Sequence, residues 1–231
     1  MKQQYALQVA YVLHTRPYRE TSLLVDAFTQ QFGRITMVAR GVKRGKQKAS
    51  AILQPFIPLL LSWYGSGDLV SLTQVEPAGV NHDLAARRAI CGLYINELLI
   101  KLLHNWDACA DLFASYEHAL TQLSLENIAA QITLRHFEKQ LLKSLGYGLQ
   151  LSREVSTGAP IQVDNYYVYD PVLGPRVVAE KVSGAILGAS ILALESGNFC
   201  KQTELLDIKH LMRIVLNHHL GARRIMAREL L

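Results

Sequence analysis

The chain has 231 residues, of which 50% are hydrophobic and 19% are charged, and this composition excludes disordered and collagen-like proteins. Its length suits one large or two modest domains, and we expect two. No stretch reaches the roughly 18 consecutive apolar residues of a membrane-spanning helix, and the first residues lack the apolar segment of a signal peptide. We therefore expect a cytoplasmic protein.

Positive charge is concentrated near the amino terminus. Residues 1–48 carry nine basic and two acidic side chains, a net charge of +7, whereas the whole chain carries +5. Within this part, residues 40–48 read RGVKRGKQK. Five cations, two glycines and no acid are too polar for a core and too rich in glycine for a stable helix. The segment predicts an exposed basic loop that binds a polyanion, the alternative being a solvated loop that binds nothing.

Five strands are predicted in the first 80 residues. Residues 5–14 have apolar side chains at a spacing of two, and four further segments, 21–29, 34–39, 56–64 and 69–75, are rich in apolar, β-branched and aromatic residues. The turn at residues 30–33, which ends in Gly33, predicts a hairpin between the second and third strands. Five strands with a long third connection are typical of an oligonucleotide/oligosaccharide-binding (OB) barrel. An SH3-like barrel fits nearly as well.

Helical periodicity begins after residue 81. Helices are predicted at residues 84–104, 108–123, 127–145, 184–194 and 203–220, the first of them largely buried. Gly146 and Gly148 are plausible helix-ending residues. Residues 152–182 interrupt the helices with prolines and a β-rich stretch. The expected fold is α+β, with an OB barrel at residues 1–80 and a helical domain at residues 81–231 that carries an irregular β-rich excursion near residues 152–182.

Motifs for catalysis are absent from the sequence. The basic segment lacks the spacing of a phosphate-binding P-loop, and neither H-E-x-x-H nor G-x-S-x-G occurs. Cys91, Cys109 and Cys200 are far apart, so we expect reduced thiols and no metal knuckle. His218 and His219 are adjacent and would point about 100° apart on a helix, which disfavours a shared metal. We therefore expect no catalytic residue, no cofactor and no enzymatic activity.

Several blocks of sequence, in the same order, resemble the bacterial RecO family of recombination mediators. The blocks are YRETSLLVDAFT (18–29), GRITMVARG (33–41), LQPFIP (53–58), GLYINELL (92–99), LRHFEKQLLKSLGYG (134–148) and the ending ARELL (227–231). The resemblance implies a protein that binds single- and double-stranded DNA, anneals complementary strands and, with RecR, helps load the RecA recombinase onto DNA coated by single-strand-binding protein. It leaves RecF open as a further partner.

Many members of this family carry four cysteines after the block that ends in Gly148. Residues 149–181 of this chain contain neither cysteine nor histidine, and a tetrahedral zinc site needs four such ligands. The chain therefore looks like the zinc-free branch of the family, and we predict no structural metal. Packing of Tyr166, Tyr167 and Tyr169 is the expected replacement, although a stacking platform for bases is an alternative.

The basic side chains of residues 16–48 are the candidate phosphate contacts. Each would release counterions on binding DNA, and a nearby aromatic ring such as Tyr18, Phe32 or Trp63 would stack on bases. Phe28, Trp63 and Tyr64 lie in strand patterns and are equally suited to the core. The candidate DNA-binding residues are Arg16, Arg19, Arg34, Arg40, Lys43, Arg44, Lys46 and Lys48.

A site for the carboxy-terminal tail of single-strand-binding protein follows from the resemblance, because in this family the helical domain holds that tail. An acidic peptide with an apolar end needs a hydrophobic notch beside a cation. In residues 134–148 the basic residues recur every four positions while apolar residues face the bundle. An ordinary amphipathic helix is the alternative. The candidate tail-binding residues are Arg135, Phe137, Lys139 and Leu142.

Two other functions remain open at this point. The chain could be a protein-interaction adaptor with little intrinsic affinity for DNA, in which the barrel only docks partners. It could also be an unrecognised metal-dependent nuclease or phosphotransferase. A steep dependence of DNA affinity on salt would distinguish a DNA-binding protein from an adaptor, and a cleavage assay with magnesium would reveal a nuclease.

Overall fold

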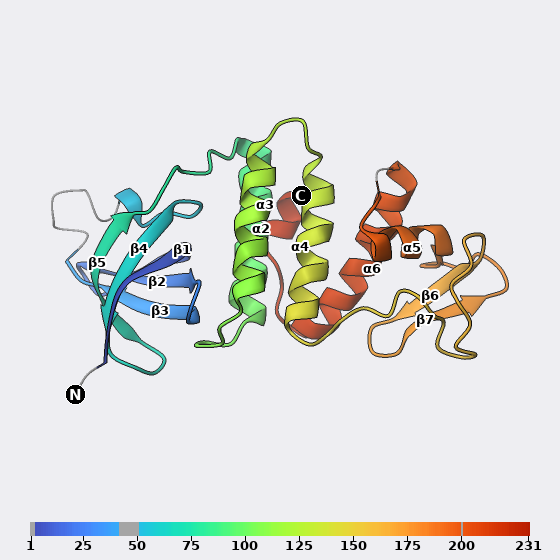
Figure 1. Ribbon diagram of the computed structural model, residues 1–231, viewed down its shortest axis with the longest axis horizontal. Helices are drawn as coiled ribbons and strands as arrows, with labels where there is room; N and C mark the ends of the chain where they lie inside the picture. The colour runs from blue at the N-terminus through green and yellow to red at the C-terminus, as the bar shows by residue number, and fades with distance from the viewer. Residues whose placement is uncertain (1–2, 42–50, 200) are drawn as a thin grey trace. The chain divides into compact units, whose positions relative to one another are not determined.

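The structure, a computed structural model, describes residues 3–41, 51–199 and 201–231. Its first part is a closed barrel of five strands in the order β1-β2-β3-β5-β4 (Figure 1). The strands are β1 (Gln4–Tyr18), β2 (Ser22–Thr29), β3 (Gly33–Ala39), β4 (Pro58–Tyr64) and β5 (Val70–Pro77). The long strand β1 pairs with both β2 and β4. The predicted α+β fold, an OB-type barrel followed by helices, is confirmed.

Gly33 makes the turn between β2 and β3 possible. The two strands pair antiparallel from Leu23–Ala39 to Thr29–Gly33. The backbone of Gly33 has a φ of +67°, and a Cβ atom on it would lie 2.0 Å from the carbonyl oxygen of Asp107. Any other residue would be strained and would also clash with this neighbouring backbone. The predicted hairpin between the second and third strands is confirmed.

The barrel core consists of the inward-facing residues of the strands. Side chains alternate across each strand, so those on one face point into the barrel. Core residues on the strands include Ala10, Val12, Val25, Ala27, Ile35, Met37, Leu59, Leu61 and Trp63. The indole of Trp63 is 0% exposed, as is the ring of Phe28. Trp63 therefore belongs to the barrel core, whereas Phe28 packs against Phe113 and Tyr116, with ring centroids 5.3 and 5.9 Å apart.

Helices α2 (Ala86–Leu102) and α3 (Ala110–Ser124) form one compact unit with the barrel, which comprises residues 1–126 and 225–231. A buried polar chain joins them to the barrel. The side-chain amide of Asn96 donates to the carbonyl oxygen of Leu13 at 3.0 Å, and the Tyr116 hydroxyl donates to Oδ1 of Asn96 at 2.8 Å. Each of these buried polar groups has a hydrogen-bond partner, so their burial costs little free energy. The two hydrogen bonds fix β1 against both helices.

Residues 127–224 form the second compact unit. It contains α4 (Ala130–Ser144), a three-stranded sheet in the order β7-β6-β8, α5 (Gly188–Ser196) and α6 (Gln202–Leu220). The strands are β6 (Tyr166–Asp170), β7 (Gly174–Val178) and β8 (Ile186–Leu187). Both units are compact by themselves, and the domain boundary near residue 80 stays a prediction.

Helix α4 ends in the glycine cap that the sequence predicts. Gly146 has a φ of +81°. Its N–H group donates to the carbonyl oxygen of Lys143 at 3.0 Å, and the N–H group of Tyr147 donates to that of Leu142 at 2.8 Å. These two bonds are those of a Schellman motif, which satisfies the last carbonyl groups of a helix.

Tyrosine packing and a tight turn hold the excursion of residues 152–182. Tyr167 and Tyr169 are 1% and 4% exposed, and the Tyr167 hydroxyl accepts a hydrogen bond of 2.9 Å from the backbone N–H of Gln162. Tyr166 is only half-buried and lies under the ammonium group of Lys181. The packing prediction is therefore confirmed for Tyr167 and Tyr169, and strand β6 contacts α6 of the same unit.

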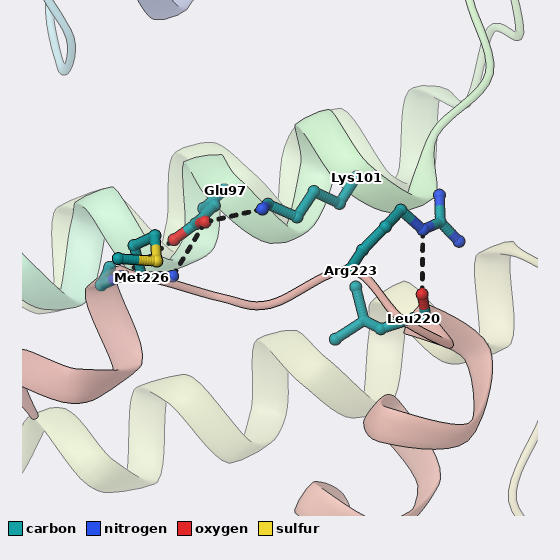
Figure 2. Close-up of polar contacts among 6 residues, drawn as sticks. Glu97, Lys101, Leu220, Arg223 and Met226 are labelled. Atoms are coloured by element: carbon teal, nitrogen blue, oxygen red, sulfur yellow. Dashed lines mark hydrogen bonds and ion pairs between the residues drawn. The ribbon is translucent and has the colours of Figure 1, made fainter.

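The last residues of the chain return to the first unit and are held there by Glu97 of α2. The Glu97 carboxylate accepts hydrogen bonds of 2.9 Å from the N–H groups of Met226 and Ala227, and it pairs with Lys101 at 3.0 Å (Figure 2). It thereby caps the short 3-10 helix η1 (Ala227–Leu230). Ile225, just before this cap, is 5% exposed. The carboxy terminus is thus an integral part of the barrel unit.

Substitution of Glu97 is expected to loosen this segment in a pH-dependent way. Burial raises the pKa of Glu97, but the N–H groups of Ala227 and Met226 and the Lys101 ammonium outweigh it and hold the pKa below its ordinary value of 4.5. A carboxyl with a lowered folded pKa stabilises the protein above its ordinary pKa, and this stability is lost as the pH falls through the folded value.

Glu97→Gln should therefore lower the free energy of unfolding at neutral pH by about 1 kcal/mol, as loss of a cap does. The difference from wild type should vanish in acid, as measured by urea unfolding. The control is Glu229→Gln, because Glu229 is an exposed residue of the same segment. A difference that persists unchanged in acid would contradict the role of the Glu97 charge.

Candidate nucleic-acid interface

One end of the barrel carries an open cleft of about 740 Å³. Three segments that are distant in sequence line it: the connection from β1 to β2, the end of β3, and the start of β5. The parallel pairing of Val38 with Ser71 brings the last two together. The lining residues are Tyr18, Arg19, Glu20, Thr21, Ser22, Val38, Arg40, Leu69, Val70 and Ser71. OB barrels bind oligonucleotides with their β1–β2 and β4–β5 loops, which are the loops that border this cleft.

Arg19 and Arg40 provide the positive charge of the cleft. Arg19 lies in the tight turn after β1 with a φ of +51°, and its guanidinium lies 5.2 Å from the centre of the Tyr18 ring. Arg40 follows β3 directly, and both arginine side chains are exposed. Exposed guanidinium groups beside an aromatic ring can contact phosphates while the ring stacks on a base.

Arg16 extends the same basic surface, whereas Arg34 does not. Arg16 is exposed on β1 and shares a strand face with Tyr18, because residues two apart point the same way. Arg34 lies at the opposite end of β3 from Arg40, is half-buried, and pairs with Asp26 of β2 at 3.9 Å. The structure therefore groups three of the four described candidate arginines and separates Arg34 from them.

The remaining four candidates, Lys43, Arg44, Lys46 and Lys48, lie outside the described residues. In sequence they begin three residues after Arg40, which lines the cleft. Glu20 is an acidic residue in the lining that the sequence reasoning missed. Its neighbours Tyr18 and Arg19 are both candidate DNA contacts from the sequence. The position of Glu20 next to them could have indicated that it lines the same site.

Of the three aromatic residues considered for base stacking, only Tyr18 lies in the cleft. Trp63 is fully buried. Phe32 packs in a cluster of rings, with centroid distances of 4.8 Å to Tyr5, 5.7 Å to Trp63 and 6.4 Å to Trp106. The interpretation of Trp63 as a stacking residue is wrong, because its strand position points into the barrel.

In the second unit, all four candidate tail-binding residues have structural contacts. Phe137 and Leu142 are 1% and 0% exposed. Lys139 donates hydrogen bonds of 2.7 Å to the carbonyl oxygens of Leu194 and Glu195 at the end of α5. Arg135 is 6% exposed and pairs with Glu138 at 2.8 Å. The basic stripe predicted along α4 is therefore partly buried.

Two cations of α6 lie in the electrostatic neighbourhood of Arg135. Burial and then the positive charges of Arg213 and Arg135 lower the pKa of Lys209, while Glu138 opposes this shift. Arg213 is exposed and Lys209 is half-buried. Arg135 of α4 thus forms a cluster of positive charge with Lys209 and Arg213 of α6, in which Arg213 is the exposed member and Arg135 pairs with the buried Glu138. The sequence reasoning considered α4 alone and so missed the contribution of α6.

Family models match both parts of the chain. Residues 1–80 match the model described as "Recombination protein O N terminal", and residues 84–229 match "Recombination protein O C terminal". The chain belongs to the RecO family. This confirms the resemblance seen in the sequence.

Curated RecO relatives align over nearly the whole chain. The chain is 45% identical to "DNA repair protein RecO" of Nitrosococcus oceani, with 97% of this chain and 92% of the relative covered. It is 43% identical to the protein of the same name from Methylococcus capsulatus, with the same coverage, and 40% identical to that of Coxiella burnetii, with 100% of both chains covered.

For this RecO protein, the described residues hold no group of three or more His, Cys, Asp or Glu side chains suited to a metal ion. Cys91 and Cys109 are reduced, while Cys200 lies outside the described residues. His219 stacks on Tyr147 with ring centroids 3.9 Å apart, and the neighbouring His218 is exposed. No helix in the described part of the chain is long and apolar enough to cross a membrane.

Dialysis of the protein against a strong chelator is expected to change neither its fold nor its DNA binding. Tyrosine packing and hydrogen-bonded turns hold residues 152–182, and domains that depend on zinc unfold when the metal is removed. Circular dichroism and an oligonucleotide titration before and after dialysis check this. Stoichiometric zinc in the purified protein, with unfolding on its removal, would contradict it.

Proposed function

We propose that this RecO protein binds single- and double-stranded DNA through the barrel cleft and anneals complementary strands. With RecR it would help load RecA onto DNA coated by single-strand-binding protein, and we propose that it does so at the nucleoid in the cytoplasm. The observation that carries the proposal is the cleft of about 740 Å³ with Arg19, Arg40 and Tyr18 in its lining.

The physical chemistry of the cleft favours a nucleic acid strand as its occupant. The cleft is bordered by the two loops that OB barrels use for oligonucleotides. Arg40 of its lining is the first residue of a sequence segment with five cations and no acid, within a part of the chain that carries a net charge of +7. Most of the affinity of such a surface for DNA comes from release of counterions, which is independent of sequence. A protein that anneals arbitrary strands needs binding of this kind.

The proposed role involves no chemical turnover. The sequence contains neither a P-loop nor the hydrolase motifs considered above. RecR, single-strand-binding protein and RecF are the partners that we propose from the family. Incubation of labelled strands with and without magnesium tests the alternative of a nuclease, and cleavage that depends on the purified protein and magnesium would exclude a purely non-enzymatic role.

A titration of labelled single-stranded oligonucleotide at several salt concentrations tests the proposed DNA binding. The logarithm of the affinity should fall linearly with the logarithm of the salt concentration, with a slope of about 0.7 for each phosphate contact. Annealing of complementary strands, bare and coated with single-strand-binding protein, measures the activity itself. A protein that binds the coating protein but shows no salt-dependent DNA affinity would be the adaptor instead.

We also propose that the tail of single-strand-binding protein binds at the cluster of positive charge on α4 and α6. The charge cluster of Arg135, Lys209 and Arg213 supports this, because an acidic tail with a terminal carboxylate favours a group of cations. The neighbouring apolar residues Phe137 and Leu142 are buried. They support the helix rather than offer contact area.

A further inference from the structure

The second unit carries a cleft of its own, beside the turn of the hairpin formed by β6 and β7. The cleft measures about 440 Å³, a volume suited to a small ligand or a few atoms of a longer one. Its lining includes two arginines, one glutamate, two uncharged polar side chains and an exposed leucine. These residues are Gln150, Arg153, Glu154, Ser156, Leu173 and Arg176.

The carboxylate of Glu154 is used by a tight turn. Its oxygens accept hydrogen bonds from the backbone N–H groups of Ser156 and Thr157 and from the Thr157 hydroxyl. The Thr157 hydroxyl and the Ser156 N–H hold the pKa of Glu154 below its ordinary value. Because these donors occupy its oxygens, Glu154 stabilises the turn and forms no ion pair with the arginines in the described part of the chain.

The two arginines of this cleft have capacity for an anion. Arg153 donates one hydrogen bond, from Nη1 to the carbonyl oxygen of Gly158 at 2.8 Å. Arg176 is exposed on β7. Within residues 3–41, 51–199 and 201–231, no carboxylate oxygen lies within 4.0 Å of either guanidinium group.

Asp170 is the acidic neighbour of Arg176. The N–H groups of Leu173 and Val172 donate to its Oδ1 at 2.8 Å, and with the positive charge of Arg176 they lower its pKa. Asp170 therefore shapes the hairpin turn and lies outside the lining of the cleft. A guanidinium with free donors is suited to the paired oxygens of a phosphate.

We propose that Arg153 and Arg176 hold the phosphate backbone of a second nucleic acid strand while the barrel holds the first. This inference rests on the proposed function, since a protein that anneals DNA must bind two strands whose phosphates repel each other. The barrel cleft and this cleft belong to different compact units, so the two sites share no residues. Leu173, which is 55% exposed, offers apolar contact for a sugar or base next to the phosphate.

The test compares Arg176→Glu with Arg87→Glu. Within the described part of the chain, the side chain of Arg176 has no hydrogen bond that its replacement would break, and Arg87 is an exposed residue of α2 outside both clefts. Both variants change the net charge equally. Three measurements are made for each: the affinity for one short oligonucleotide, the number of oligonucleotides bound per chain at saturation, and the annealing rate of bare complementary strands.

We expect wild type and Arg87→Glu to bind two short oligonucleotides per chain and Arg176→Glu to bind one. Annealing by Arg176→Glu should be about tenfold slower, the loss expected for one charge-assisted hydrogen bond to phosphate. The affinity of the barrel cleft for its oligonucleotide should not change. Arg153→Gln should have the same effect in the same direction.

Equal stoichiometry and equal annealing rates for Arg176→Glu and Arg87→Glu would overturn this inference and leave the proposed DNA binding intact. Loss of binding to an acidic peptide by Arg176→Glu, with DNA binding and annealing unchanged, would also overturn it and assign the cleft to a protein partner. A wild-type protein that binds no DNA at all would instead contradict the proposed function.

Discussion

Replacement of Lys43, Arg44, Lys46 and Lys48 by alanine is expected to weaken DNA binding strongly without unfolding the protein. These side chains follow Arg40 of the cleft in a segment with two glycines and no acid, and such segments add little to a core. If each cation contacts a phosphate, the slope of log affinity against log salt should fall by about 0.7 per lost cation for single strands and about 0.9 for duplex DNA.

Arg19→Ala/Arg40→Ala tests the described part of the same surface. Both arginines are exposed, so the fold should be retained. The slope for single strands should fall by up to about 1.4. Arg87→Ala is the control for a lost surface cation outside the cleft. The measurement is fluorescence anisotropy of a labelled oligonucleotide at several salt concentrations.

The outcomes separate the two parts of the proposed surface. If the four-residue variant keeps its affinity and slope while Arg19→Ala/Arg40→Ala loses both, binding is confined to the cleft. If neither variant differs from Arg87→Ala, the barrel cleft does not bind DNA and the proposed function is contradicted. Phe32 needs no test as a stacking residue, because it already packs against Tyr5 and Trp63.

The strands of the barrel could be predicted because each strand can be recognised from its own residues. A period-two pattern predicted the first strand, local composition predicted the other four, and Gly33 predicted the turn between β2 and β3, where its φ is +67°. The cleft could not be predicted in the same way. It depends on the parallel pairing of Met37 and Val38 with Val70 and Ser71, and no local pattern specifies which distant strand closes a barrel.

Helix α4 also shows that contacts with distant segments cannot be predicted from the local sequence. Its apolar positions were predicted correctly, since Leu134, Phe137 and Leu141 are buried. Arg135 was expected at the rim of a notch but is 6% exposed. Glu138 lies three residues later, a spacing that brings two side chains together on a helix, so an internal ion pair was the available signal. The charges of Lys209 and Arg213 come from α6 and could not be found from α4.

Arg135→Glu is expected to destabilise the protein, because it removes a buried ion pair and leaves two carboxyl groups in contact. Arg135 and Glu138 are 6% and 0% exposed and lie 2.8 Å apart. Breaking a buried pair costs about 3–5 kcal/mol, whereas replacing both partners by apolar residues is often neutral. Arg135→Met/Glu138→Leu should therefore unfold in urea close to wild type, while Arg135→Glu unfolds much earlier. Equal stability of wild type and both variants would show that this ion pair does not stabilise the fold.

The stable double variant then allows a clean test of tail binding, together with Arg213→Glu. Arg213 is exposed, so its substitution should leave the fold intact. Loss of the cation facing an acidic tail should weaken binding of a tail peptide about tenfold, and should slow annealing of coated strands while bare strands anneal as before. Arg87→Glu should change none of these. Unaltered peptide affinity in both Arg213→Glu and Arg135→Met/Glu138→Leu would contradict the proposed tail site, since neither the exposed Arg213 nor the buried Arg135 would then contribute to holding the terminal carboxylate.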